Sequence, residues 1–263
     1  MGIEETVERI KDQVQLREQR RKEIEKREGV GMDKPYSMKR TLYSCSKCRD
    51  TSWLLIDGKA RRCGCYEIKR LKRIWEKSGI SLEQKEMTFK SFNAYSKEIK
   101  NAKDTATKYY INYKVIKDSR NNSIVFLGQV GSGKTHLSIA LAINFINKEI
   151  PVIYMPYRDV IMNIKQNILD SIYYRKTIER YQKAEILLID DLYKGKITES
   201  DINILFEIIN YRYLNNKAII VSSERSIDEI LRIDEGIGSR IYEMCKGYLV
   251  EIRGKGNNYR VRG

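Results

Sequence analysis

Eight residues near the middle of the sequence have the types and the spacing that bind the phosphates of a nucleotide. Residues 128–135 read GQVGSGKT and fit the pattern G-x-x-x-x-G-K-[ST] at every required position. The glycines let backbone N–H groups turn inward around phosphates, where larger side chains would block the approach. We expect Lys134 to reach the β- and γ-phosphates of ATP and the Thr135 hydroxyl to ligate Mg²⁺. The predicted cofactor-binding residues are Gly128, Gly131, Ser132, Gly133, Lys134, Thr135 and His136.

The residues on both sides of this loop support the same interpretation. An apolar run, Ile124–Leu127, precedes the loop, and a helical pattern from Leu137 to Asn147 follows it. A helix that begins at the loop offers its positive N-terminal end to phosphate. The alternative is a chance glycine-rich turn, which these flanks argue against. His136 is the only histidine in the chain, and packing or a local hydrogen bond is its expected role.

Two consecutive carboxylates follow another apolar run. Residues 186–191 read ILLIDD. A strand beside the phosphate loop would bring Asp190 to Mg²⁺ through water and Asp191 to the attacking water, because successive side chains of a strand point in opposite directions. The alternative is an acidic turn without a catalytic role. Together with the loop, the pair predicts ATP hydrolysis with Lys134, Asp190 and Asp191 as catalytic residues.

Two later segments could complete such a site. A third apolar run, 218–221, ends in Ser222-Ser223-Glu224, where a polar group could sense the γ-phosphate and orient water; Ser223 is the catalytic candidate. Arg240 follows Gly238-Ser239 at a predicted helix start. An arginine presented in this way could reach the γ-phosphate of a neighbouring subunit, and an ordinary surface arginine is the alternative.

Four of the five cysteines form two close pairs. They are Cys45, Cys48, Cys63 and Cys65, spaced C-x₂-C, fourteen residues, C-x-C. Zn²⁺ takes four such thiolates in a tetrahedron, and a hairpin turning at Asp57-Gly58 would bring the pairs together. Metal binding would then supply folding free energy to a segment with little core. We predict a structural Zn²⁺, with free structural cysteines as the alternative, and we expect Cys245 in the core.

Cations and aromatic rings gather in residues 157–182, between two of the apolar runs. Single-stranded DNA is gripped by this mixture, with cations on phosphates and rings under bases. The candidate contacts are Arg158, Lys165, Tyr173, Tyr174, Arg175 and Lys176. A charged helix pair with core tyrosines is the alternative, because the chain has 18 tyrosines. Nothing here indicates base-specific recognition.

Composition favours a basic protein without a membrane segment. The formal net charge is +15, and most of the surplus lies in the first 122 residues. Such a surplus suggests a polyanionic partner, most commonly nucleic acid, although it could serve solubility alone. The chain has no run of about eighteen apolar residues, and residues 1–5 lack the apolar core of a signal peptide. We therefore expect a cytoplasmic protein.

Alternating strands and helices must position these groups. Strand-like segments are 123–127, 151–155, 185–189, 217–222 and 247–252. Helical segments are 96–117, 134–147, 158–169, 171–183, 200–214, 226–232 and 235–246. This alternation predicts an α/β fold, a parallel five-stranded sheet with helices on both faces. Residues 3–28 predict a charged helix whose thin apolar stripe suits docking to a partner or leaves the helix solvated.

Together these motifs resemble the AAA+ ATPases of the bacterial and phage helicase-loader family, the DnaC/DnaI type. The resemblance rests on GQVGSGKTHL, ILLIDDLYKGKITESDINILFEIINYRY, IIVSSERSIDEIL and IGSRIYEMCKGYLVEI, within roughly residues 79–263. It implies Walker A roles for Lys134 and Thr135 and Walker B roles for Asp190 and Asp191. It further implies that one of residues 222–224 is sensor 1, that Arg240 is a trans-acting finger, and that residues 157–182 face DNA.

The sequence departs from the family pattern at two positions. Asp191 stands where the usual catalytic residue is glutamate, and Ser223-Glu224 stands where relatives often have Ser-Asn. The last predicted strand ends almost at the end of the sequence, so we expect no C-terminal lid domain. Arg260 is the only late candidate for a second sensor arginine.

The resemblance implies an ATP-dependent loader of the replicative hexameric helicase onto single-stranded DNA. Residues 1–40 would form a docking helix, 41–78 a zinc module, 79–122 a linker with the leading helix, and 123–263 the ATPase domain. Copies would associate through their ATP sites, and hydrolysis between subunits would drive release. The alternatives are a transposition helper ATPase of the IstB type and an ATP-gated adaptor with little hydrolysis.

Overall fold

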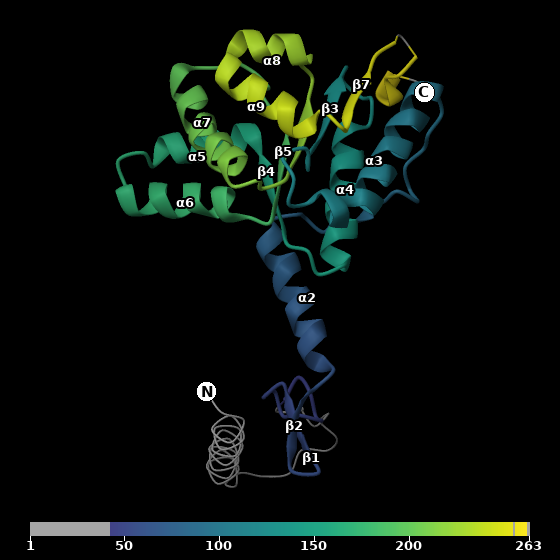
Figure 1. Ribbon diagram of the computed structural model, residues 1–263, viewed down its shortest axis with the longest axis vertical. Helices are drawn as coiled ribbons and strands as arrows, with labels where there is room; N and C mark the ends of the chain where they lie inside the picture. Colours follow the sequence, from purple (N-terminus) through teal and green to yellow (C-terminus); the bar gives the residue numbers. More distant parts are fainter. Residues whose placement is uncertain (1–42, 255, 262–263) are drawn as a thin grey trace, which may run out of the picture. The chain divides into compact units, whose positions relative to one another are not determined.

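The computed structural model describes residues 43–254 and 256–261 (Figure 1). The chain divides into two compact units between Lys72 and Arg73, within helix α2 (Cys65–Ser78). The helix predicted over residues 3–28, and with it the proposed docking segment 1–40, lies outside the described residues.

In the first unit, two short strands form an antiparallel hairpin. Strand β1 (Trp53–Ile56) pairs with β2 (Lys59–Arg62), and Trp53 lies opposite Arg62. Asp57 and Gly58 join the strands with φ angles of 51° and 72°, the left-handed pair that a two-residue type I′ turn requires. The hairpin predicted at Asp57-Gly58 is confirmed.

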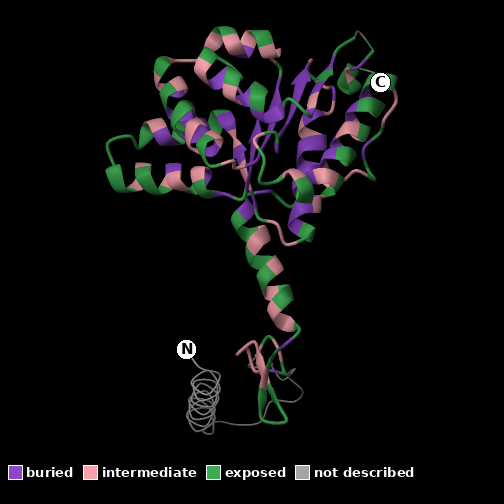
Figure 2. Ribbon diagram, in the orientation of Figure 1, coloured by how far each residue is buried: buried purple, intermediate pink, exposed green. Residues whose placement is uncertain are grey.

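The second unit is built on a five-stranded parallel sheet. Its strands are β3 (Ile124–Gly128), β4 (Val152–Pro156), β5 (Ile186–Asp190), β6 (Ile219–Ser223) and β7 (Leu249–Ile252), in the spatial order β4-β5-β6-β3-β7. Strands β3, β5 and β6 are buried along their full length (Figure 2), as expected of parallel strands covered on both faces. These three are neighbours, so their carboxyl ends meet at one edge of the sheet.

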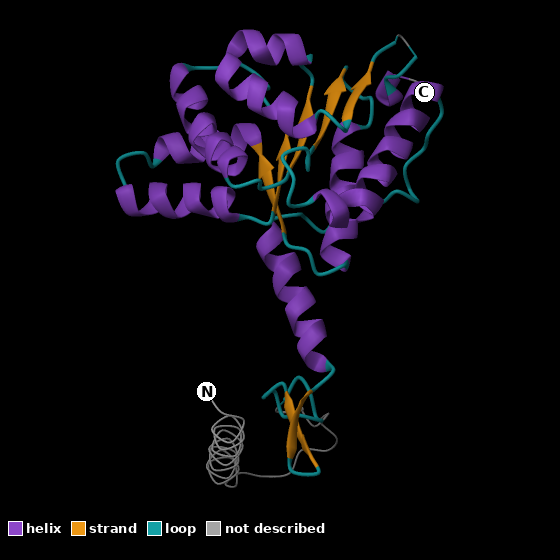
Figure 3. Cartoon of the chain, viewed as in Figure 1, coloured by secondary structure: helices purple, strands orange, loops and turns teal. Residues whose placement is uncertain are grey.

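Helices cover both faces of this sheet (Figure 3). The described helices of the unit are α3 (Lys97–Ile116), α4 (Lys134–Asn147), α5 (Tyr157–Gln166), α6 (Ser171–Lys183), α7 (Glu199–Leu214), α8 (Ile227–Ile233) and α9 (Glu235–Cys245), with short 3₁₀ turns η1 (Gln84–Glu86) and η2 (Tyr259–Val261). Helices α3 and α4 lie on one face, and α5 to α9 share a core with the other. The predicted fold class, a parallel five-stranded α/β sheet, is confirmed.

One predicted helix is shorter than expected. The segment 158–169 was expected to be helical throughout, but α5 ends at Gln166. The Asp170 side chain accepts hydrogen bonds from the backbone N–H groups of Ile172 and Tyr173 and so caps the next helix. Residues 167–169, between the end of α5 and Asp170, turn away from the core, and Leu169 is 97% exposed.

A fully buried arginine joins the amino ends of the strands to helix α6. Arg212, on α7, is 0% exposed. Its guanidinium donates to the carbonyl oxygens of Tyr181 at 2.8 Å, Ala184 at 2.9 Å and Ala218 at 2.5 Å. Burial lowers the pKa of Arg212, and these carbonyl dipoles replace the water that the charge has lost. The arginine therefore fixes where α6 ends and where β5 and β6 begin.

Candidate functional site

The phosphate-loop motif forms the connection between β3 and α4. Gly128 ends β3, and α4 begins at Lys134 after Gly133, whose φ is 82°. Gly128 has a φ of 131°, and a Cβ there would lie 2.1 Å from the carbonyl oxygen of Ile252 on β7. Only glycine therefore fits at Gly128, and its role here is to let the loop leave the sheet past β7.

Two side chains of this loop, Lys134 and Thr135, lie near the carboxyl end of β5. Lys134 is 5% exposed, and its Nζ donates to the Gln129 carbonyl oxygen at 2.7 Å. Burial lowers the pKa of Lys134, and the nearby Glu224 and Asp191 carboxylates oppose that shift. The Thr135 Oγ1 donates to Asp190 Oδ1 at 2.9 Å. The loop and the end of β5 thus meet as the two motifs predicted.

Asp190 is a buried carboxylate with three donors. Besides Thr135, it accepts hydrogen bonds from the hydroxyl of Tyr154 at 3.1 Å and from that of Ser222. Burial raises the pKa of Asp190, since desolvation disfavours the charged form. A divalent cation held here would oppose that effect. Hydroxyl and carboxylate oxygens are the ligands that Mg²⁺ prefers, so the donor set of Thr135 and Asp190 fits Mg²⁺.

The residue after Asp190 leaves the strand in an unusual conformation. Asp191 has a φ of 56°, and its backbone N–H donates to the Ser222 Oγ at 2.9 Å. Its carboxylate accepts a hydrogen bond from Lys194 Nζ at 2.6 Å, and Lys194 also lies 3.5 Å from a Glu224 oxygen. Sequence motifs did not identify Lys194. The one signal that could have found it is a turn: Lys194 lies three residues after Asp191 and directly before Gly195.

The three candidates for sensor 1 have different surroundings. Ser222 lies beneath the carboxylates and bonds Asp190. Ser223, named as catalytic, donates instead to the Leu192 carbonyl oxygen at 2.7 Å and does not line the cavity. Glu224 does line it. Neither serine lines the cavity; the alternation of side chains along β6 turns Ser222 toward Asp190 and Ser223 toward Leu192.

The charged groups of the loop, of the end of β5 and of residue 224 border one cavity of about 600 Å³. Ligand sites commonly combine a few polar groups with an apolar lining. On this cavity the polar groups include Ser132, Lys134, Thr135, Asp190, Asp191, Lys194, Glu224 and Arg260, and the apolar and aromatic lining includes Met87, Phe92, Tyr95, Ile99 and Tyr259. Sequence reasoning missed the aromatic residues, because they come from segments far apart in the chain without a motif.

His136 ties one of these segments to α4. Its Nε2 donates to the Thr88 carbonyl oxygen at 2.9 Å, and its ring meets Phe92 edge-on at 5.1 Å. His136 also borders the cavity. A local hydrogen bond and packing, the role expected for this histidine, are what the structure shows.

The C-terminal segment lies against the phosphate loop. The backbone N–H of Tyr259 donates to the Gly131 carbonyl oxygen at 3.0 Å, and Gln129 Nε2 donates to the Gly254 carbonyl oxygen at 2.9 Å. Gly131 has a φ of 73°, and a Cβ there would lie 2.0 Å from Asn258 Oδ1. Arg260, the late arginine of the sequence analysis, is thereby brought to the cavity.

Arg240 lies outside this cavity, on α9. Its Nη1 donates to the Gly236 carbonyl oxygen at 2.8 Å and its Nε to Asn210 Oδ1 at 3.1 Å. The guanidinium also lies over the rings of Phe206 and Tyr213. Residues of α7 and α9 thus hold the arginine in place, and it does not line the cavity of its own chain.

The candidate DNA contacts divide into two groups. Arg158, on α5, and Arg175 and Lys176, on α6, are exposed. The other three have local partners: Lys165 pairs with Asp201 at 2.7 Å, Tyr173 bonds Asn163, and the Tyr174 hydroxyl donates to Glu207 at 2.7 Å. The first three are therefore the ones whose charges face solvent.

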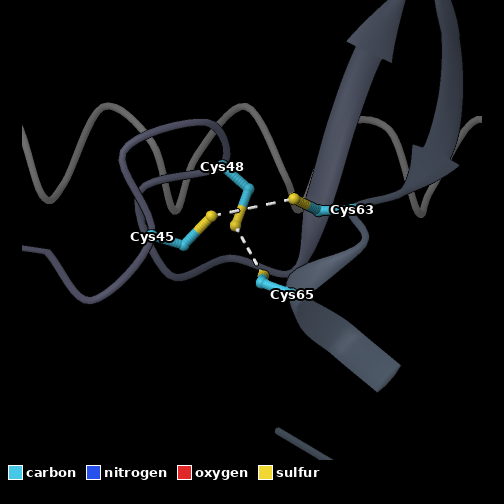
Figure 4. A group of neighbouring side chains, drawn as sticks. All are labelled: Cys45, Cys48, Cys63 and Cys65. Atoms are coloured by element: carbon cyan, nitrogen blue, oxygen red, sulfur yellow. Dashed lines mark hydrogen bonds between the residues drawn. The ribbon is translucent and has the colours of Figure 1, made fainter. Parts of the chain in front are cut away.

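The four clustered cysteines converge in the first unit (Figure 4). Their sulfur atoms all lie within 4.8 Å of one another, with Cys45 to Cys63 at 3.8 Å and Cys48 to Cys65 at 3.3 Å. A tetrahedral Zn²⁺ with bonds of about 2.3 Å separates its sulfur ligands by about 3.8 Å. The donor set and spacing therefore fit Zn²⁺.

Asp50 organises the first cysteine pair. Its carboxylate accepts the backbone N–H groups of Ser44 at 2.9 Å and Cys45 at 3.1 Å, and Lys69 Nζ at 2.6 Å. The pKa of Cys45 is lowered to about 6, chiefly by a backbone hydrogen bond from Cys48. Cys245 is fully buried in the second unit, as expected of a core residue.

Comparison with known proteins relates the chain to ATP-binding proteins. The sequence model of a family described as IstB-like ATP binding protein matches residues 69–262. The phage-like element PBSX protein XkdC of Bacillus subtilis (strain 168) is 37% identical over 245 residues, which cover 88% of this chain and 91% of that protein.

Solved structures share the fold of the second unit. A replication initiator DnaA bound to AMPPCP and single-stranded DNA is 24% identical with a TM-score of 0.56, over 68% of this chain and 53% of the other. The DnaC helicase loader is 21% identical with a TM-score of 0.52, over 66% of this chain and 100% of the other. The chain thus spans only about half the length of the DnaA chain. Among the described residues, none of the helices is both long enough and apolar enough to cross a membrane.

Proposed function

The chain belongs to the IstB-like ATP-binding protein family, and we propose that it is an AAA+ ATPase that loads a replicative DNA helicase onto single-stranded DNA. The observation that carries the proposal is the cavity at the carboxyl edge of the sheet, where Lys134, Thr135, Asp190 and Asp191 meet. The similarity in fold to the DnaC helicase loader directs the proposal to helicase loading. We place this activity in the cytoplasm.

In the proposed reaction, the residues around the cavity hold ATP and activate water. Backbone N–H groups of residues 131–135 cradle the phosphates, and Lys134 leaves the Gln129 carbonyl for the β- and γ-phosphate oxygens. Thr135 and Asp190 hold Mg²⁺, which neutralises charge that develops on the phosphates. Asp191 orients the attacking water, and Ser222 holds the Asp190 carboxylate and the backbone N–H of Asp191. The aromatic lining, including Phe92 and Tyr259, takes the base.

The remaining surfaces have separate proposed partners. Exposed Arg158, Arg175 and Lys176 contact the phosphates of single-stranded DNA. The zinc module, 41–78, and the docking segment, 1–40, hold the hexameric helicase. Residues 79–122 lead into the ATPase domain of 123–263. Arg240 completes the ATP site of a neighbouring copy, so hydrolysis depends on assembly.

Two other functions have a specific observation in their favour. A transposition helper ATPase is favoured by the description of the family model, which names IstB. An ATP-gated adaptor with little hydrolysis is favoured by the ion pair that engages the Asp191 carboxylate. The cysteine centre distinguishes neither alternative from a loader, so an experiment with a helicase is required.

The deciding experiment measures helicase loading by the purified full chain. The substrate is a fork whose single strand is coated with single-stranded DNA-binding protein, and the helicase is the replicative hexamer of the same host. We expect ATP and the chain together to start strand displacement that the helicase alone does not achieve, and Lys134→Ala to abolish the effect. No stimulation and no co-sedimentation with the helicase would reject loading; capture of a transposase instead would favour the IstB-type role.

A further inference from the structure

The loop after β5 carries a lysine to the nucleotide cavity that no phosphate-binding motif includes. Lys194 borders the same cavity as Lys134 and Thr135. Its ammonium group contacts Asp191 at 2.6 Å and Glu224 at 3.5 Å. Burial is the main cause that lowers the pKa of Lys134, and the positive charge of Lys194 lowers this pKa further. A positive charge therefore lies beside the residues proposed to meet the terminal phosphates.

The backbone holds this loop firmly while leaving the lysine side chain exposed. Leu192 and Tyr193 are each 1% exposed, and the Leu192 N–H and carbonyl oxygen bond Ser222 and Ser223 of β6. Tyr193 has a φ of 60°, a left-handed conformation that side chains rarely adopt. The buried side chains of Leu192 and Tyr193 and the left-handed conformation of Tyr193 therefore direct Lys194 toward the cavity. The Lys194 side chain remains 44% exposed.

The ion pair that Lys194 now makes is one that a phosphate can displace. Both partners are partly in water, since the Asp191 and Glu224 side chains are 32% and 33% exposed. Ion pairs at such positions contribute little to stability because water and salt screen them. A terminal phosphate carries more charge than one carboxylate and offers three acceptor oxygens. A terminal phosphate can therefore replace these carboxylates as the partner of the lysine.

We propose that Lys194 recognises the γ-phosphate: its ammonium group leaves Asp191 and Glu224 for the terminal phosphate of ATP, which distinguishes ATP from ADP and frees Asp191 to orient water. This inference rests on the proposed ATPase function. ADP has no phosphate at that position, so with ADP the lysine keeps its carboxylate partners. Glu224 competes with the phosphate for the lysine.

The test compares the affinity of the full chain for Mg²⁺ complexes of ADP and of a non-hydrolysable ATP analogue, by titration calorimetry. Lys194→Met should weaken binding of the analogue about tenfold or more, the value of a lost charge-assisted bond, and change ADP affinity less than about twofold. Lys194→Arg should restore most of the preference. Glu224→Gln should strengthen binding of the analogue, because it removes the competitor. Lys196→Met, two residues along and outside the cavity lining, is the matched control.

Unchanged affinities in Lys194→Met would overturn the inference, and so would an equal loss for both nucleotides. Melting temperatures without nucleotide identify a variant that has failed to fold, and Lys194→Arg then carries the test. If the unaltered chain bound neither nucleotide, the proposed ATPase function itself would fail. The two failures can be told apart. If the unaltered chain prefers the analogue and Lys194→Met keeps that preference, only the role of Lys194 is rejected.

Discussion

Two adjacent buried serines at the end of β6 make hydrogen bonds to different residues. Ser222 donates to Asp190 and accepts the N–H of Asp191. Ser223 donates to the Leu192 carbonyl oxygen and accepts the N–H of Arg225 at 3.1 Å. Only Ser222 touches the residues proposed to bind Mg²⁺ and water. The structure thus favours Ser222 over Ser223 as the residue that positions the catalytic groups.

Alanine substitution separates the two serines. Ser222→Ala should lower the ATPase turnover by about tenfold or more, because Asp190 and Asp191 lose a shared anchor. Ser223→Ala should leave turnover within about twofold. Each change removes the two hydrogen bonds of a buried hydroxyl and should cost about 1–3 kcal/mol of stability, measured by denaturant unfolding. A larger loss of turnover in Ser223→Ala would restore Ser223 as the sensor.

At the residue scale, the sequence predicted what lies within a motif and missed what lies between motifs. Lys134, Thr135 and Asp190 could be predicted to meet, because a fixed loop and a strand end carry them. Lys194 could not, because its direction depends on the left-handed Tyr193. Phe92 and Tyr259 could not either, since long-range packing alone brings them to the cavity.

At the scale of elements, Arg212 connects helix α6 with two strands. We predict that Arg212→Met, which keeps much of the length, destabilises the chain by about 3–5 kcal/mol because buried carbonyls lose their donor. For a unit of this size each kcal/mol corresponds to about 2–4 °C, so thermal melting should fall by roughly 6–20 °C. Arg232→Met, at an exposed position of α8, is the control. A shift in Arg212→Met as small as that of the control would contradict this role.

The cysteine centre should hold one Zn²⁺ and stabilise only its own unit. Cys48→Ser removes one of four ligands, and we expect the variant to lose the zinc that elemental analysis finds in the unaltered chain. The hairpin around Trp53 should lose its fixed structure, visible in tryptophan fluorescence. Affinity for MgATP should stay within about twofold, because residues 73–261 form their own compact unit. Cys245→Ser should keep zinc; equal zinc in Cys48→Ser would contradict the assignment.

Element boundaries show how far local patterns reach. The helices at 134–147 and 171–183 have the predicted bounds, because a loop glycine and the Asp170 cap define their starts. The predicted end of α5 was wrong. The apolar residues Ile168 and Leu169 continue the helical pattern, but α5 ends at Gln166 and Asp170 caps the next helix. The segment after β7 has no periodicity, and its contacts with Gln129 and Gly131 were not predictable.

At the scale of the whole molecule, the role proposed for Arg240 requires contact between copies of the chain. We predict that Arg240→Ala keeps MgATP affinity but loses at least about a hundredfold in turnover. Lys134→Ala should also be inactive, but because its own site no longer binds MgATP. A mixture of the two should regain activity, because some sites then combine an intact Lys134 with a neighbour's Arg240. An inactive mixture, with both variants folded, would contradict a finger acting in trans.

The measurement that tests the account most directly is the affinity of the purified full chain for ATP with and without Mg²⁺, beside Lys134→Ala. Every proposed role depends on triphosphate binding at residues 128–135. We predict saturable binding that strengthens with Mg²⁺ and weakens by about a hundredfold or more in Lys134→Ala, the size of a lost buried charge contact. An affinity for ATP that changes neither with Mg²⁺ nor in Lys134→Ala would contradict the central claim.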